Sequence, residues 1–208
     1  LRQNVERVLG VVLHNGYGLT ETSPTISRTL YAVGSNEVNI GTPIPGVEIK
    51  IVGSDGCEIM DGSPGELHVR GPNVMLGYFR QPELTEAVID KDGYLNTGDI
   101  VSVNSKQEMV VQGRTKELII RSGFNVYPPE IEAALNTHPA VLNSAVFWRS
   151  IEGNEEIVAF VEPVPGCHIE IDTLFALLDE QLARYKKPQK IIVMSQLPVA
   201  PNGKIRKN

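Results

Sequence analysis

The spacing of apolar residues changes near residue 113, and this change restricts the chain to a mixed fold in two parts. Between residues 41 and 113, apolar residues alternate in short runs such as residues 47–52, and turns rich in Gly, Pro, Asn and Asp separate the runs. Such runs predict the strands of a small barrel or a twisted sheet. After residue 113, helical stripes such as the leucine-rich segment 174–185 alternate with strands. The sequence therefore predicts an α+β fold, with a β-rich part over residues 1–113 and a compact α+β part over residues 114–208.

Local signals predict the individual elements. Residues 1–9 have the apolar spacing of a helix, and residues 15–18 have the composition of a tight turn. Prolines at positions 128 and 129 predict the start of a helix that runs to about His138, and Asp172 is the expected N-cap of a second helix. Strands are expected at residues 47–52, 66–70, 100–103, 108–111, 117–120, 141–148, 156–161 and 191–194.

Charge is distributed unevenly along the chain. The net charge is −6, yet residues 184–208 hold seven basic residues and no acidic one, which leaves 12 basic and 25 acidic residues before them. An acidic body with a basic end favours contact between that end and an anion, and the alternative is a solvated tail. A nucleic-acid partner is not expected, because the basic stretch contains one aromatic residue, Tyr185, and no recognised binding motif.

Cysteine usage and hydropathy indicate where the protein works. Cys57 and Cys167 are far apart and form no CxxC motif, which favours a reducing compartment and hence the cytoplasm. No apolar run approaches the roughly 18–20 residues that a membrane span needs. We therefore expect no transmembrane segment, although peripheral contact with a membrane stays open.

Widespread catalytic motifs do not occur in this sequence. It contains no GxxxxGK[ST], GxGxxG, HExxH or GxSxG pattern and no paired-cysteine metal site, and its four histidines are scattered. No widespread motif therefore identifies the chemistry of this chain.

Two loops carry residue types suited to a nucleotide. In the first, Tyr17 can stack on a flat ring, the Thr20 hydroxyl can donate to a phosphate, and the Glu21 carboxylate can bind a hard cation such as Mg²⁺. In the second, Asp99 follows Thr97 and Gly98 and can accept hydrogen bonds from the two hydroxyls of a ribose. The alternative for both loops is ordinary turn chemistry.

The order of these loops along the chain resembles the adenylate-forming superfamily, which includes acyl-CoA synthetases, 4-coumarate–CoA ligase, beetle luciferase and the adenylation domains of peptide synthetases. The resemblance covers essentially the whole chain and is greatest to bacterial medium- or long-chain acyl-CoA synthetases. It rests on residues 15–21, 94–99, 113–118, 122–132 and 198–206, with support from residues 41–46, 65–72 and 77–79.

The resemblance implies a role for each residue of the nucleotide site. It implies that Tyr17 packs against adenine, Thr20 contacts the α-phosphate and Glu21 binds Mg²⁺. It also implies that Asp99 holds the ribose hydroxyls with help from Arg114. ATP, Mg²⁺ and CoA are the implied cofactors and substrates, together with a small carboxylic acid of the fatty or aryl class.

Four further residues receive roles from the same resemblance. Lys204 matches the lysine of the adenylation step, and it lies within the basic end of the chain. Lys116 matches the hinge between the large and small domains, where the family often has Asp. Gly123 and Phe124 match the loop that lines the pantetheine tunnel for the thioester step.

The resemblance also implies that this chain is the C-terminal portion of a longer enzyme. In the family, a phosphate-binding loop and most of the acyl pocket precede the segment that matches this chain. Residues 1–113 would then be the end of the large adenylating domain, and residues 114–208 the small mobile domain. The implied reaction converts a carboxylic acid, ATP and CoA to acyl-CoA, AMP and pyrophosphate, and we expect this chain alone to be inactive.

Two alternatives stay open at this point. A relative that adenylates an acid and passes the acyl group to a carrier protein would share every motif up to the thiol acceptor. The chain could instead act only as a binding or regulatory module, as the missing phosphate loop would allow. The sequence sets neither the acyl chain length nor the oligomeric state.

Overall fold

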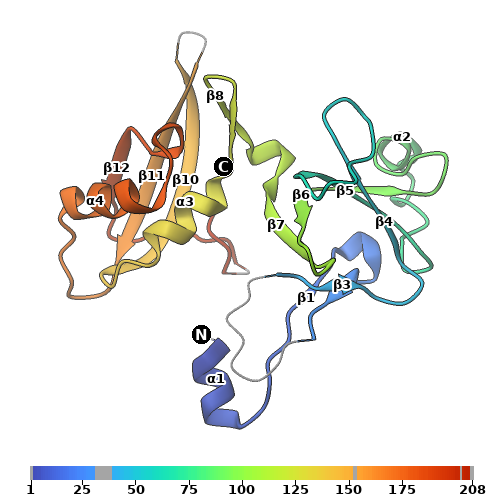
Figure 1. Ribbon diagram of the computed structural model, residues 1–208, viewed down its shortest axis with the longest axis horizontal. Helices are drawn as coiled ribbons and strands as arrows, with labels where there is room; N and C mark the ends of the chain where they lie inside the picture. The colour runs from blue at the N-terminus through green and yellow to red at the C-terminus, as the bar shows by residue number, and fades with distance from the viewer. Residues whose placement is uncertain (1, 31–38, 152–153, 202, 207–208) are drawn as a thin grey trace. The chain divides into compact units, whose positions relative to one another are not determined.

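The computed structural model describes residues 2–30, 39–151, 154–201 and 203–206. The chain separates into two compact units, Leu1–Thr115 and Lys116–Asn208. This division falls two residues beyond residue 113, near which the spacing of apolar residues changes. No helix among the described residues has the length and apolar content required to cross a bilayer. Figure 1 shows the elements of both units, each of which is described below by itself.

The first unit is built on a four-stranded antiparallel sheet with the order β4-β5-β6-β7. A smaller antiparallel sheet has the order β1-β2-β3, and a bridge between Gly41 and Met109 joins its last segment to β7. The helices and strands are α1 (Arg2–Leu9), β1 (Gly16–Tyr17), η1 (Thr20–Thr22), β2 (Ser27–Arg28), β3 (Thr42–Pro43), β4 (Glu48–Val52), β5 (Gly65–Arg70), α2 (Pro82–Glu86), β6 (Leu95–Val103) and β7 (Met109–Arg114).

Alternation along β5 fixes which face of the larger sheet is buried. Leu67 and Val69 are fully buried, whereas Glu66 and His68 lie on the opposite, half-buried face. The buried residues pack with Ile26, Ile51, Leu95, Val101 and Met109. Burial of this many large apolar side chains, each worth about 1.5–3 kcal/mol, stabilises the first unit.

The prediction of a tight turn at residues 15–18 is wrong. Gly16 and Tyr17 form β1 and pair with Arg28 and Ser27, a long-range pairing that local turn composition does not reveal. Gly18 is required for a different reason, because the carbonyl oxygen of Pro24 lies 1.6 Å from the position that a Cβ at residue 18 would occupy. This glycine permits the close approach of two backbone segments.

The second unit contains a two-stranded hairpin and a three-stranded sheet. In the larger sheet, β10 and β11 are antiparallel, and β12 runs parallel to β11. Its elements are η2 (Thr115–Glu117), which begins at the last residue of the first unit, then β8 (Ile119–Arg121), β9 (Phe124–Val126), α3 (Pro128–Leu135), β10 (Val141–Ile151), β11 (Asn154–Pro163), α4 (Ile171–Gln181), η3 (Arg184–Lys186) and β12 (Lys190–Val193).

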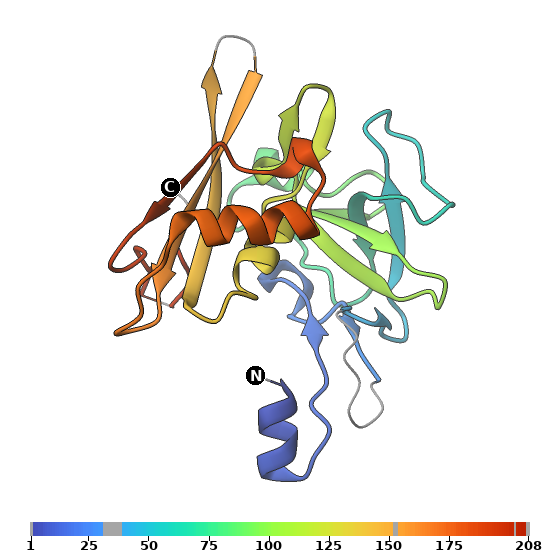
Figure 2. The same cartoon turned by 60° about the vertical axis from the view of Figure 1, so that its left-hand side comes forward.

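The two helices cover one face of this three-stranded sheet, as Figure 2 shows. Ile131 and Leu135 of α3 and Leu174 and Leu178 of α4 are fully buried. They pack into one core with the helix-facing residues of the strands. The first part of the helical stripe predicted in segment 174–185 is therefore the face that α4 buries, but α4 ends at Gln181, so Leu182 and Tyr185 lie beyond it.

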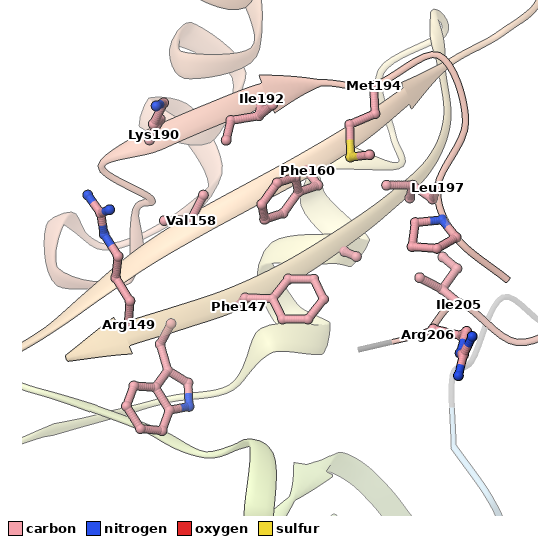
Figure 3. A pocket seen from close by; sticks show the side chains of 13 residues that line it. Phe147, Arg149, Val158, Phe160, Lys190, Ile192, Met194, Leu197, Ile205 and Arg206 are labelled. Carbon is pink, nitrogen blue, oxygen red and sulfur yellow. The ribbon is translucent and has the colours of Figure 1, made fainter. Parts of the chain in front are cut away.

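The opposite face of the sheet carries an apolar hollow of about 500 Å³. Phe147 and Phe160 meet edge to face at its centre, with ring centroids 5.5 Å apart. Ile192 of β12 and Met194, which directly follows that strand, complete the apolar floor, as Figure 3 shows.

Three expectations for the second unit are corrected. The segment 117–120 is not one strand, because residues Thr115–Glu117 form a 3₁₀ turn and β8 begins at Ile119. Residues Phe124–Val126, which form β9 and pair with β8, were not predicted to be a strand. Asp172 lies inside the first turn of α4, and the N-cap position belongs to Glu170. A carboxylate in the first turn still favours the helix through its dipole.

Candidate functional site

A bulge in β6 presents the carboxylate of Asp99. On β5, Glu66 pairs with Ile100 and His68 pairs with Asn96. Three residues of β6, 97–99, therefore lie opposite the single residue Leu67. Such a bulge ends the regular ladder and changes the direction of a side chain.

Hydrogen bonds from Thr97 hold this bulge in place. The Thr97 hydroxyl donates to the Leu67 carbonyl oxygen at 2.8 Å, and the Asp99 amide donates to the Thr97 hydroxyl oxygen at 3.1 Å. Gly98 has a φ of +69°, a conformation that favours glycine. The Thr-Gly-Asp order of the sequence is therefore what shapes this turn.

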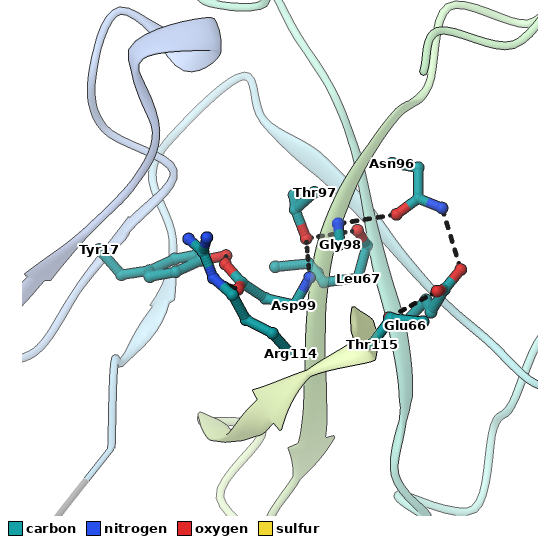
Figure 4. Close-up of polar contacts among 9 residues, drawn as sticks. All are labelled: Tyr17, Glu66, Leu67, Asn96, Thr97, Gly98, Asp99, Arg114 and Thr115. Atoms are coloured by element: carbon teal, nitrogen blue, oxygen red, sulfur yellow. Dashed lines mark hydrogen bonds and ion pairs between the residues drawn. The ribbon is translucent and has the colours of Figure 1, made fainter. Parts of the chain in front are cut away.

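The structure brings together three of the residues that the sequence assigned to the nucleotide. The Tyr17 hydroxyl donates to Asp99 Oδ2 at 2.6 Å, and Arg114 Nε donates to Asp99 Oδ1 at 2.9 Å, as Figure 4 shows. Asp99 is 4% exposed, so the charge of its carboxylate is compensated by these two donors. Arg114 lies opposite Asp99 in the β6–β7 ladder, and its side chain is 58% exposed.

Burial raises the pKa of Tyr17 well above its ordinary value, and the hydrogen bond to the Asp99 carboxylate raises it further. Ionisation would place a phenolate beside a carboxylate in a poorly solvated position. Tyr17 is therefore a neutral hydrogen-bond donor at physiological pH.

This shift predicts a loss of stability at high pH. The folded-state pKa of Tyr17 lies above the unfolded value of about 10, so its contribution is complete below pH 10 and is lost as the pH rises toward the folded value. Between pH 8 and about pH 11, the free energy of unfolding should fall by about 1.4 kcal/mol more in the wild type than in Tyr17→Phe. Urea unfolding at the two pH values measures this difference. Equal losses in both proteins would contradict it.

The second group of predicted residues lies on the 3₁₀ turn η1. The Thr22 side chain closes this turn, since its hydroxyl oxygen accepts from the Leu19 amide at 2.9 Å. The Asn73 side-chain amide donates to the carbonyl oxygens of Thr22 and Thr25 at 3.1 and 2.7 Å. These contacts fix the backbone that carries Thr20 and Glu21, of which Thr20 is exposed.

The Glu21 carboxylate suits a single contact to a metal ion. Tyr78 donates its hydroxyl proton to Glu21 Oε1 at 3.0 Å, which orients the group. Among the described residues, no cluster of three or more His, Cys, Asp or Glu side chains is arranged to hold a metal. Mg²⁺ is commonly held by one or two carboxylates together with substrate phosphates and water. The donor set at Glu21 fits that mode.

The remaining predicted residues belong to the second unit. Lys116 is exposed within η2, and Lys204 is exposed beside the bridge between Val199 and Ile205. Gly123, with a φ of +82°, lies in the turn between β8 and β9. Phe124 begins β9 and stacks on Tyr185, with ring centroids 4.6 Å apart.

Sequence reasoning missed Tyr78 as a residue of this site. Tyr78 lies within the supporting segment 77–79, but it received no role there. Its partner Glu21 is 57 residues away in sequence, so no spacing rule could have paired the two side chains.

Comparison with known proteins places the chain in a family. Residues 1–79 match the AMP-binding enzyme family, and residues 130–204 match the AMP-binding enzyme C-terminal domain. The long-chain-fatty-acid–CoA ligase of Escherichia coli O157:H7 is 39% identical over 200 residues, which is 96% of this chain and 35% of that ligase. The 4-coumarate–CoA ligase 1 of Oryza sativa subsp. japonica is 37% identical over 203 residues, which is 94% of this chain and 36% of that ligase.

Solved structures agree with this placement. ATP-bound MatB from Rhodopseudomonas palustris has a TM-score of 0.87 and 33% identity, over 99% of this chain and 42% of that one. The Bacillus subtilis o-succinylbenzoate–CoA synthetase MenE, in complex with ATP and a magnesium ion, has a TM-score of 0.87 and 31% identity, over 98% and 42%. The chain thus spans about a third of the length of the curated relatives that it matches. It belongs to the adenylate-forming, AMP-binding enzyme family, whose members among these relatives include acyl- and aryl-CoA ligases.

Proposed function

We propose that this chain serves an ATP-dependent acyl-CoA synthetase, which converts a carboxylic acid, ATP and CoA to acyl-CoA, AMP and pyrophosphate through an acyl-adenylate. The observation that carries the proposal is the buried Asp99 carboxylate between Tyr17 and Arg114. A charged group is rarely buried unless it is paired, and such groups concentrate at functional sites.

In the proposed role, Asp99 binds the ribose of ATP. A carboxylate offers about four lone-pair positions, and Tyr17 and Arg114 use one each. Acceptor positions for two ribose hydroxyls therefore remain. The exposed Arg114 side chain covers this group, and its outward displacement would admit the diol.

The phosphates would be bound at η1. The Thr20 hydroxyl would donate to the α-phosphate, and Glu21 would hold Mg²⁺ against the phosphate oxygens. When bound, Mg²⁺ neutralises charge on those oxygens. Tyr17 would place one face of its ring against adenine while its hydroxyl stays on Asp99.

The first half-reaction needs a positive charge near the α-phosphate. As the substrate carboxylate attacks, negative charge builds on the phosphoryl oxygens, and a fixed ammonium group lowers this barrier electrostatically. Lys204 is the residue that we assign to this task. Its position in the basic end of the chain gives that end a function beyond solvation.

The second half-reaction needs a different arrangement around the same adenylate. The CoA thiol attacks the acyl carbonyl and expels AMP, and the Gly123–Phe124 turn would line the path of its pantetheine arm. Lys116 lies in the exposed turn at the boundary between the two units, and we propose that it is the hinge that exchanges the two arrangements.

A reconstitution experiment tests the proposal. The 208-residue chain alone should give no carboxylate-dependent exchange between ATP and pyrophosphate. A protein that carries this chain behind the N-terminal part found in its relatives should form thioesters from fatty or aryl acids with CoA. Exchange by the chain alone would contradict a divided site. Adenylate formation with transfer to a carrier protein but not to CoA would favour the carrier-loading alternative, and nucleotide binding without chemistry would favour a binding module.

A further inference from the structure

The carboxylate of Glu66 lies beside the β6 bulge and contacts two segments of the first unit. Its Oε2 accepts a hydrogen bond from the Asn96 side-chain amide at 2.9 Å, and its Oε1 accepts one from the Thr115 hydroxyl at 2.6 Å. Both bonds are drawn in Figure 4. The Glu66 side chain is 31% exposed, so water competes only partly for these bonds.

The Asn96 contact extends to the turn that presents Asp99. The Asn96 side-chain oxygen accepts from the Gly98 amide at 2.8 Å. Asn96 thereby links Glu66 to the residue immediately before Asp99. Fixing the Asn96 amide fixes the orientation of this turn.

The Thr115 contact extends to the other charged group of the site. Thr115 directly follows Arg114, whose Nε donates to Asp99 at 2.9 Å. The hydrogen bonds and the chain therefore close a ring, from Glu66 through Asn96 and Gly98 to Asp99, and back through Arg114 and Thr115. We propose that Glu66 is a positioning residue with two arms, its hydrogen bonds to Asn96 and to Thr115. Through these two arms it holds the side chains of Asp99 and Arg114 in their relative positions.

Two substitutions at residue 66 distinguish the effect of its hydrogen bonds from the effect of its packing. Alanine removes both acceptors. Glutamine can accept from Asn96 with its oxygen and donate to the Thr115 hydroxyl with its nitrogen, because a hydroxyl accepts as well as donates. For these two bonds a charge is therefore dispensable, whereas a planar polar group with two hydrogen-bonding atoms is required; the contact between Glu66 Oε2 and His68 Nε2, 3.9 Å apart, belongs to neither bond.

The first test uses the 208-residue chain without nucleotide. In Glu66→Ala, the Tyr17–Asp99 bond should weaken, and the exchange rate of the Tyr17 hydroxyl proton with water, followed by NMR near neutral pH, should rise at least about tenfold. Glu66→Gln should stay within about twofold of the wild type. Glu48→Ala is the matched control, because it removes a carboxylate that pairs with Arg70 on the same sheet and touches neither arm.

A second pair of variants tests the Thr115 arm alone. Thr115→Val removes the hydroxyl at nearly constant shape, and Thr115→Ser retains it. In Thr115→Val, the exchange rate of the Arg114 Nε proton should rise about fivefold or more, as expected for loss of one hydrogen bond to a charged group. In Thr115→Ser it should stay near the wild-type rate.

The consequence for nucleotide rests on the proposed function and is measured separately. In the longer protein, Glu66→Ala should raise the KM for ATP about tenfold, and Glu66→Gln should restore it. An unchanged exchange rate of the Tyr17 hydroxyl proton in Glu66→Ala, or an equal change in Glu48→Ala, would overturn the positioning role. A faster exchange of the Tyr17 hydroxyl proton with an unchanged KM would support that role and would instead count against Asp99 as the ribose ligand.

Discussion

Replacing Lys204 with alanine in the longer protein should slow adenylate formation by about 10²–10³-fold, the usual cost of removing one preorganised group that stabilises transition-state charge. Reaction of a supplied acyl-adenylate with CoA should stay within a few-fold of the wild type. The two steps differ because the ammonium group is needed only while charge builds at the α-phosphate. Burst measurements of adenylate and of thioester, made separately, resolve them.

The backbone around Lys204 does not depend on the side chain of this residue for the two hydrogen bonds that hold the loop. Its side chain is exposed, and the loop around it is held by backbone bonds, from the Ala200 amide to the Lys204 carbonyl oxygen at 2.7 Å and from the Arg206 amide to the Pro198 carbonyl oxygen at 2.8 Å. Alanine at position 204 leaves these bonds intact. Lys190→Ala, which removes another exposed lysine of the same unit, is the control and should change neither step.

A substitution at Gly123 should produce the opposite imbalance. Leucine there would fill the path proposed for pantetheine, so thioester formation should fall while adenylation persists. The φ of +82° at this glycine strains any other residue, although no atom lies within 4 Å of a Cβ built there. Gly123→Ala shares the strain, of about 1 kcal/mol, without the bulk, and is the matched control. Equal loss of both steps in Lys204→Ala and Gly123→Leu would contradict the separation of roles.

Period-two alternation was enough to predict the main strands. It indicated β4, β5, β7 and the second half of β6, residues 100–103, because each strand has one buried face and short, turn-like connections. Residues 95–99, which were expected to form a loop, are the first half of β6. The buried face of α4 could also be predicted, because Leu174 and Leu178 recur at helical spacing. Both residues are fully buried in the structure. Both patterns are local, so they can be recognised without knowledge of the rest of the chain.

The elements that sequence reasoning missed depend on distant partners. Strand β1 has two residues, and it forms because Tyr17 and Gly16 pair with residues 27 and 28. Strand β9 sits across a two-residue turn with positive φ at Ser122 and Gly123, in a segment whose polar composition resembles a loop. Neither segment carries enough periodic signal to identify a strand.

The chemistry of the site was predictable and its geometry was not. Asp99, Tyr17 and Arg114 were identified by motif resemblance, which carries residue types and order. That the Tyr17 hydroxyl meets the Asp99 carboxylate, 82 residues away, follows only from the fold. The same holds for Glu66 of β5, whose two hydrogen bonds reach Asn96 of β6 and Thr115, the residue after β7.

The largest conformational effect is expected at Lys116, where the two units meet in the chain. Lys116→Pro fixes φ near −65° and disfavours helical backbone at the preceding residue, Thr115. Thr115 lies in the 3₁₀ turn of residues Thr115–Glu117, so proline opposes the conformation of this turn. In the longer protein, we expect one arrangement to be trapped. If the altered backbone matches the adenylating arrangement, the acyl-adenylate should form and accumulate while thioester formation falls by about 100-fold, the scale of a misplaced reacting group.

A general loss of folding is the competing explanation, and the structure limits it. Lys116 is exposed and precedes β8, which begins at Ile119, so proline removes no bond of a strand ladder. The melting temperature should therefore fall by only a few degrees, about 4–8 °C per kcal/mol in a small domain. Lys116→Ala keeps the backbone free to move and should retain both half-reactions. A hinge that is frozen must slow one half-reaction more than the other while each unit remains folded. An unchanged thioester rate in Lys116→Pro would therefore refute the hinge. Equal loss of both half-reactions together with a collapsed melting temperature would refute it as well.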